Sequence, residues 1–300
     1  MEITESTEWA ALIVQGISTG CIYGILGLAI GFTYRAARVG NFAQANMATF
    51  SAYIMYSLLH IFSFYIAFAL TLFLAFVYGA AIHVFIIRKI RANNRLDTEF
   101  VAMIITIGLM TIFSGLSRIL GGSMPKIFPP MFPETSISYH GIIASYRDVG
   151  IVGVTILLAI SLSCFFRFTR LGLALEAAAE NKLAAGLRGV RIHHMLTLSW
   201  GISSAVGTLS GVLIAPVLGL SPGMLGTIFL FAYTASVVGG LKSPIGTLAG
   251  GVIVGIVENL SSTVPAVGSE LKTVVVFLFL IATLYIWPRG IFGRPEMRRV

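Results

Sequence analysis

The stretch that decides the fold is Ile192–Leu241, IHHMLTLSWGISSAVGTLSGVLIAPVLGLSPGMLGTIFLFAYTASVVGGL, which contains no Asp, Glu, Lys or Arg. Because about 20 apolar residues span a bilayer, this run is long enough for two crossings. Val39–Ile87 also lacks charged residues and is long enough for two, and Trp9–Tyr34 is long enough for one. The sequence therefore predicts an all-α protein, a polytopic bundle of transmembrane helices.

Most of the 20 Lys and Arg residues lie in short stretches between the apolar runs. These stretches are Arg35–Arg38, Arg88–Arg95, Arg167–Arg191, Lys242 and Arg289–Arg299. Lys and Arg accumulate in cytoplasmic loops, so each stretch is predicted to lie inside the cell. Nine crossings that start outside satisfy this condition, with an external N-terminus and a cytoplasmic C-terminus.

The predicted crossings span residues 9–33, 39–61, 63–87, 99–120, 149–167, 194–217, 223–241, 244–264 and 271–287. The second opens with Asn41, Gln44 and Asn46, so we expect a broken or re-entrant segment near 39–61. Eight full crossings with one broken segment therefore remain an alternative to nine. The connection Gly121–Asp148 contains four prolines, and we expect an ordered external loop there that includes a short surface helix.

Glycine is the second compositional signal, with 32 residues, many at small-xxx-small spacing. Gly16 with Gly20, Gly207 with Gly211, and Gly251 with Gly255 each place two glycines on one helix face. Small residues let helix backbones approach closely in lipid, so the pattern predicts a tightly packed bundle.

Composition excludes several classes of protein. The chain is 57% hydrophobic and 11% charged, unlike an ordinary soluble domain. Its net charge of +8 does not indicate nucleic-acid binding, because the basic residues lie beside the apolar runs. Gly239–Ser243 has Leu241 where a phosphate-binding loop needs Gly, and no nucleophile–base arrangement is evident. We therefore expect no enzyme, cofactor or metal site.

The basic stretch Arg167–Arg191 contains a helical pattern. Leu171, Leu175, Ala178 and Leu183 repeat at helical spacing, which predicts a short amphipathic helix over Leu173–Gly189. Such a helix can lie passively on the membrane surface or serve as a docking element for a cytoplasmic partner. Both interpretations remain open on spacing alone.

The same segment resembles the cytoplasmic coupling loop of permease subunits of bacterial branched-chain amino acid ABC transporters. The matching residues are Arg170, Gly172, Ala177, Ala179, Glu180, Asn181, Gly189 and Val190. The resemblance extends over nearly the whole chain, through Asn41–Gln44 and Ala52–Tyr53 to the tail Pro288–Glu296. Of the two permease types in these transporters, the chain is similar to the shorter one.

The resemblance implies one transmembrane permease domain over residues 1–300, with a cytoplasmic coupling loop at 167–193. It implies a subunit of an importer in the bacterial inner membrane, forming half of the pathway for branched-chain or other small hydrophobic amino acids. The implied partners are a second permease subunit, two cytoplasmic ATPase subunits that bind the ATP, and an external binding protein.

The resemblance also assigns roles to individual residues. Coupling to the ATPase falls to Arg170, Gly172, Ala177, Ala179, Glu180, Asn181 and Gly189. We expect the pathway to be lined by Asn41, Gln44, Asn46, Tyr233 and Glu258. Glu258 is a carboxylate deep in an apolar run, which costs about 2.5–3.5 kcal/mol on insertion scales. It is either a hydrogen-bonded cap on neighbouring backbone or a polar element near the external mouth.

Some positions depart from the family pattern. Ala45 and Asn46 replace the usual Gly and acidic residue, and Phe231 stands where Lys is often found. These departures leave a transporter for urea, short amides or other small solutes as an alternative. A secondary transporter is the alternative of another class, which usually needs a buried ionisable residue.

Overall fold

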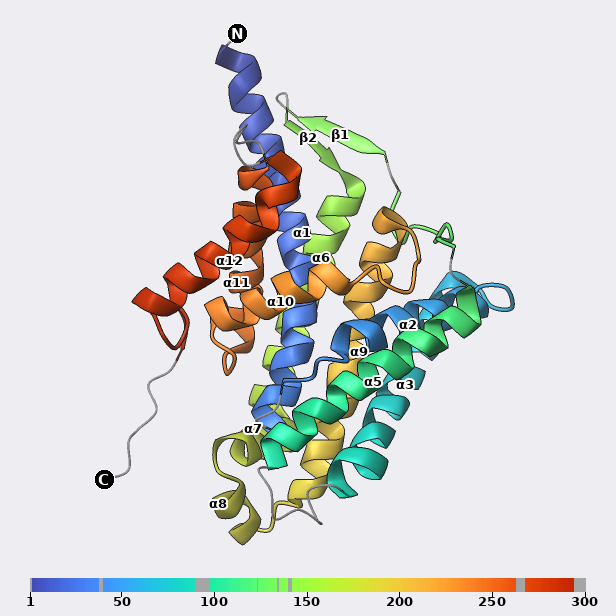
Figure 1. Cartoon of the computed structure of the whole chain (residues 1–300), viewed down its shortest axis with the longest axis vertical. Coiled ribbons are helices and arrows are strands. Elements are labelled where there is room, and N and C mark those ends of the chain that lie inside the picture. The colour runs from blue at the N-terminus through green and yellow to red at the C-terminus, as the bar shows by residue number, and fades with distance from the viewer. Residues whose placement is uncertain are drawn as a thin grey trace. The chain divides into compact units, whose positions relative to one another are not determined.

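The computed structural model describes residues 2–37, 40–89, 98–122, 124–133, 135–139, 142–262 and 268–293. Apolar helices dominate this part of the chain (Figure 1). They are α1 (Glu2–Ala37), α2 (Gln44–Leu58), α3 (Phe64–Ile82), α5 (Thr98–Gly121), α6 (Tyr146–Phe168), α9 (Ile192–Leu218), α10 (Gly226–Gly239), α11 (Pro244–Ser261) and α12 (Gly268–Ile286). Among the described residues, six helices are long and apolar enough to cross a membrane. The chain is thus a multi-pass membrane protein, as the charge-free runs predict.

The chain divides into two compact units, which are described separately. Unit 1 comprises Met1–Gly27, Pro129–Ala159 and Ile228–Val300. Unit 2 comprises Leu28–Phe128 and Ile160–Thr227.

In unit 1, α1 and α11 cross at their glycines. A Cβ added at Gly20 would lie only 2.6 Å from the carbonyl oxygen of Gly251, and one at Gly255 would collide with the carbonyl oxygen of Gly16. The two backbones therefore touch, which only glycine permits. The close packing predicted from these glycines is confirmed.

In unit 2, α9 packs against both α2 and α3. A Cβ at Gly211 would lie 2.6 Å from the carbonyl oxygen of Ala48, so α2 and α9 also meet at backbone distance. Trp200 of α9 and Met47 of α2 share a buried cluster with residues of α3 and α5. At the end of α3 the helix continues as a π-helix, η1 (His83–Ile87).

The second predicted crossing is short, as expected. Residues 40–43 are not helical, and α2 has 15 residues. At 1.5 Å per residue its length is about 22 Å, less than the ~30 Å hydrocarbon core. The polar residues at its start therefore coincide with an interrupted segment.

The expectation of a surface helix in the connection Gly121–Asp148 is wrong. The described residues 124–133 form no helix, and the chain then forms an antiparallel hairpin from β1 (Ser136–Tyr139) and β2 (Ile142–Ser145), which leads into α6 (Figure 1). The four prolines upstream disfavour a helix, and the Ile and Tyr residues of the strands favour extended structure.

The α1–α11 contact makes a stability prediction. Gly20→Ala should destabilise unit 1 by about 1–3 kcal/mol, because the new methyl group has no space beside Gly251. Gly153→Ala in α6 is the matched control, since a Cβ there meets nothing within 4 Å. Thermal unfolding of the purified variants in detergent measures both. Equal midpoints for the two variants would contradict the backbone contact.

Candidate functional site

Two of the predicted pathway residues hold the start of α2. Asn41 Oδ1 accepts a hydrogen bond from the Ala43 amide at 3.1 Å, and Asn41 Nδ2 donates to Gln44 Oε1 at 3.0 Å. The side chains of Asn41 and Gln44 are buried, with exposed fractions of 1% and 0%. Unpaired amides would be costly in this environment, so these bonds stabilise the first turn of the helix.

Gln44 also joins α2 to α9. Its Nε2 donates to the carbonyl oxygen of Ser203 at 3.1 Å. The hydroxyl of Ser203 lies 3.0 Å from Gln44 Oε1 and 2.6 Å from the carbonyl oxygen of Ala29 in α1, and its one hydrogen serves either acceptor. A Cβ at Gly207 would collide with Gln44 Nε2. Gly207 thus makes room for the amide that links the helices.

Asn46 differs from the other two amides. It is half-buried, and no hydrogen bond of its side chain is found within the part of the chain that the structure describes. The two donors and the carbonyl oxygen of this amide remain available for an added group. Of the three amides predicted to line the pathway, Asn46 is the one whose side chain is not engaged by its own helix neighbours.

A cluster of hydroxyl groups lies further along the same helices. The Ser51 hydroxyl is 2.6 Å from the Tyr78 hydroxyl of α3 and accepts from Thr208 of α9 at 2.8 Å. Tyr78 also donates to the carbonyl oxygen of Met47 at 2.9 Å. The sequence pattern did not reveal this cluster, because Ser, Thr and Tyr are frequent in apolar helices and only packing shows which of them meet.

Glu258 is held by side chains from two other helices. Its carboxylate, 5% exposed as a residue, accepts from the Tyr23 hydroxyl of α1 at 2.5 Å and pairs with Lys272 Nζ of α12 at 2.7 Å. The structural alternative predicted hydrogen bonds to neighbouring backbone, whereas both partners of the carboxylate are side chains. The partner Lys272 could have been suspected from the sequence, as it is a cation just inside the last apolar run.

Tyr233, the fifth predicted pathway residue, lies half-buried on α10 with its ring 6.2 Å from that of Phe229. No group of three or more His, Cys, Asp or Glu that could hold a metal ion occurs among the described residues.

The predicted coupling segment forms two helices instead of one. α7 (Arg170–Glu180) and α8 (Lys182–Leu187) are separated at Asn181, whose backbone is extended. The Asn181 side chain accepts from the Ala184 amide at 3.0 Å and so caps α8. Asn favours caps over helix interiors because its side chain competes for backbone groups, which explains the break. Gly189 follows α8 with a φ of +83°, a conformation that favours glycine.

Other features fix α7 against the end of α6. Thr169 caps α7 by accepting from the Gly172 amide at 3.0 Å. A Cβ at Gly172 would collide with the carbonyl oxygen of Phe165, so the backbone of α7 touches the last turns of α6. Of the predicted coupling residues, Gly172 is buried, Ala179 and Asn181 are half-buried, and the others are exposed: Arg170, Ala177, Glu180 and Gly189.

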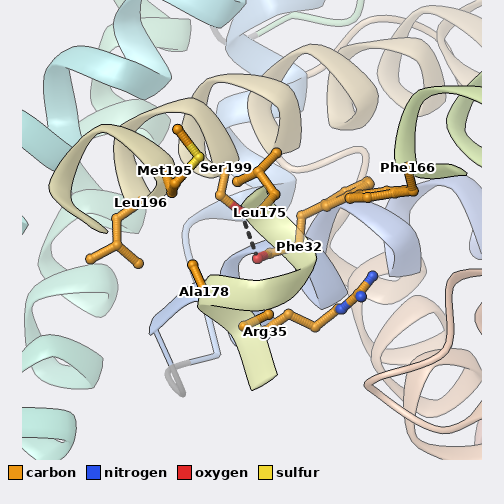
Figure 2. Close-up of a pocket in the computed structure, with 9 residues that line it drawn as sticks. Phe32, Arg35, Phe166, Leu175, Ala178, Met195, Leu196 and Ser199 are labelled. Carbon is orange, nitrogen blue, oxygen red and sulfur yellow. Dashed lines mark hydrogen bonds between the residues drawn. The ribbon is translucent and has the colours of Figure 1, made fainter. Parts of the chain in front are cut away.

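A small apolar pocket lies between α7, α9 and the end of α1 (Figure 2). Leu175 and Ala178 of α7 line it opposite Phe32 of α1 and Leu196 of α9. The Ser199 hydroxyl donates to the carbonyl oxygen of Phe32 at 3.0 Å, the bond dashed in Figure 2. The inward face of α7 therefore faces the end of α1 and α9 across this pocket, and α7 also contacts α9.

Comparison with known proteins identifies relatives over the full length. A family model described as "Branched-chain amino acid transport system / permease component" matches residues 12–284. The chain is 27% identical to the high-affinity branched-chain amino acid transport system permease protein BraD of Pseudomonas aeruginosa, over 96% of this chain and 97% of that protein. It is 28% identical to LivH of Escherichia coli, with the same description, over 95% and 96% of the two proteins.

A probable branched-chain amino acid transport permease protein, LivH of Methanocaldococcus jannaschii, is 29% identical over 90% of this chain and 88% of its own. Among solved structures, PsaBC from Streptococcus pneumoniae in complex with Fab aligns with a TM-score of 0.50 over 96% of both chains, at 14% identity. That structural match concerns the fold alone.

The Glu258 pair makes a prediction that separates charge from hydrogen bonding. Lys272→Met should leave a buried, uncompensated carboxylate and destabilise the protein by about 1–2 kcal/mol, since the partial exposure of Lys272 weakens the pair. Glu258→Gln should cost less, because an amide still accepts from Tyr23. The double variant should be more stable than Lys272→Met alone. Unfolding in detergent measures the three, and simple additivity would exclude coupling between the two residues.

Proposed function

Because the chain belongs to the family of branched-chain amino acid transport system permease components, we propose that it is the transmembrane permease subunit of an ATP-driven importer for branched-chain or other small hydrophobic amino acids. The observation that carries the proposal is the family match over residues 12–284, which includes parts of every apolar helix from α1 to α12. The relatives named for this transport cover nearly the whole chain at similar length, which supports the same role here.

The proposed path of the solute runs along α2. This helix is too short to span a bilayer, and interrupted helices are how many transporters place polar groups at the middle of the membrane. Asn41 uses its hydrogen-bonding groups at the start of α2, and Gln44 uses its own on Asn41 and on Ser203 of α9. Asn46 retains both donor and acceptor groups, so we assign it the contact with the solute. An amide can donate to a carboxylate and accept from an ammonium group.

The proposed docking surface for the ATPase is the outward side of α7 and α8. Large apolar side chains are exposed there, among them Leu173, Leu183 and Leu187. Glu180 is exposed beside them at the end of α7 and offers a charge to a basic residue of the partner. An apolar surface with one charged residue beside it is suited to binding in a groove of a cytoplasmic subunit. A second permease subunit and an external binding protein would complete the importer.

Within unit 2, a series of helix contacts connects the proposed docking surface for the ATPase with the proposed solute path. The inward side of α7 rests on α9 through Leu175 and Ala178, and α9 holds α2 through Ser203 and Gln44. A displacement of α7 caused by the ATPase would therefore be transmitted to α2, the helix that carries Asn46, through contacts that all lie within unit 2. We propose this route as the link between ATP hydrolysis and transport.

Uptake of radiolabelled leucine tests the function and the docking surface together. The chain is reconstituted in proteoliposomes with its partner permease, ATPases and binding protein. Leucine uptake should require ATP and be inhibited by isoleucine and valine. Glu180→Lys and Leu187→Glu should each lower uptake by about tenfold or more, because they place a wrong charge in the docking groove.

The control for these variants is Ile61→Glu, which adds a carboxylate at an equally exposed residue in the turn between α2 and α3. It should leave uptake and ATP hydrolysis unchanged. Inhibition by urea or short amides in place of valine would move the substrate class to the alternative. Normal coupling in Glu180→Lys and Leu187→Glu would exclude the docking surface.

Thiol labelling tests the assignment of Asn46. In a Cys21→Ala, Cys164→Ser background, single cysteines replace Asn46 and Gln44. A water-soluble maleimide should label position 46 and be slowed by bound leucine, whereas position 44 should stay protected because its side chain is fully buried. Labelling at 44 and not at 46, in any state of the transport cycle, would reverse the assignment.

A further inference from the structure

The outer connection is tied to the loop after α9 by a single antiparallel bridge. The Lys126 amide donates to the carbonyl oxygen of Leu220 at 3.0 Å, and the Leu220 amide donates to that of Lys126 at 2.9 Å. All parts of this contact belong to unit 2. We call Met124–Phe128 the strap, and the strap together with Leu220 the clasp.

The clasp lies over the C-terminal end of α2. The Tyr53 hydroxyl donates to the carbonyl oxygen of Leu220 at 3.3 Å. The ammonium group of Lys126 lies 5.0 Å from the centre of the Tyr56 ring, a cation–π contact. Tyr53 and Tyr56 follow Asn46 by two to three helical turns. The clasp thus covers the end of α2 away from its buried amides.

The strap is held mainly through its backbone. Met124 and Ile127 are 81% and 93% exposed, so they do not pack against unit 2. Phe128 is buried and anchors one end of the strap, while Gly122, with a φ of +75°, turns the chain out of α5 at the other. Breaking two backbone hydrogen bonds and the Lys126 contact would release the strap without unfolding a helix.

The loop that carries Leu220, the other half of the clasp, begins at a weakened helix end, and Leu220 itself is fully buried. Pro216 removes a backbone hydrogen bond from the last turn of α9, and Gly219 follows with a φ of +75°. A Cβ at Gly223 or Gly226 would meet nothing within 4 Å. The loop therefore has open space beside Gly223 and Gly226, whereas a Cβ at Gly219 would contact Pro125 and Lys126 of the strap.

We propose that the clasp is the outer gate of the solute path along α2, closed in this structure and opened when the strap lifts from Leu220. The inference rests on the proposed function, which makes α2 the path, and on the predicted external side of the connection Gly121–Asp148, which contains the strap. Because so few bonds hold it, docking of the external binding protein can open it and the loss of that contact can close it.

A disulfide across the clasp tests the gate in the reconstituted transporter. Lys126→Cys and Leu220→Cys are combined in the Cys21→Ala, Cys164→Ser background. A hydrogen-bonded antiparallel pair has Cα atoms about 5.5 Å apart, within the range of a disulfide. Oxidation should lower leucine uptake by about tenfold or more, and dithiothreitol should restore it. The single-cysteine variants, treated in the same way, should show the same uptake before and after oxidation.

Two results of this experiment would overturn the gate. One is normal uptake by protein in which mass spectrometry shows a complete disulfide. The other is a folded double variant that forms no disulfide under oxidation, since the two residues would then not be paired.

A second variant tests the gate by thiol labelling, without a measurement of transport. Tyr53→Phe removes one hydrogen bond of the clasp and keeps the ring. It should raise the rate at which a membrane-impermeant maleimide labels Lys126→Cys, by about two- to tenfold. An unchanged or lower rate would count against the gate. No leucine uptake by the cysteine-free parent would overturn the proposed function instead, and this labelling would still judge the clasp.

Discussion

Two buried amides in an apolar surrounding impose the constraint on which unit 2 depends. Because both side chains are buried, the hydrogen-bonding groups of Asn41 and Gln44 must be paired with other protein groups. They find each other, the first turn of α2, and Ser203 of α9. Gly207 has no side chain because the Gln44 amide occupies that space. The position of a helix too short to span a bilayer is thereby fixed by hydrogen bonds to a longer one.

In unit 1, close contact between helix backbones fixes the position of the helices. Gly16 and Gly20 of α1 face Gly251 and Gly255 of α11, and neither helix could accept a methyl group there without moving. In lipid the hydrophobic effect contributes little to helix association, so close van der Waals contact contributes a larger share of the stability. The same helices also bring Tyr23 to Glu258, which makes a buried carboxylate tolerable.

The features proposed for transport are distributed along α2 and α9. α7 and α8 present apolar side chains outward and rest on α9, α9 holds α2, and the clasp lies across the end of α2. The strong contacts, at Gln44 and Gly211, join helices that must move together. The weak contact, a single backbone bridge, lies at the proposed gate. Strong contacts between helices that move together, and weak contacts where parts separate, are what an ATP-driven conformational cycle requires.

The sequence alone determined the membrane class, the helix positions and the glycine contacts, because hydrocarbon imposes length, charge and packing rules that act locally along the chain. The interruption before α2 followed from Asn41, Gln44 and Asn46 for the same reason. Spacing could not show that Asn181 would divide the coupling segment or that the outer connection would form a hairpin, since caps and strand pairing depend on local hydrogen bonds. Only the tertiary structure decided which polar groups meet: that Gln44 bonds Ser203, that Asn46 stays unengaged by its helix neighbours, and that Lys126 pairs with Leu220. Those partners are distant in sequence, and only packing brings them within hydrogen-bonding distance.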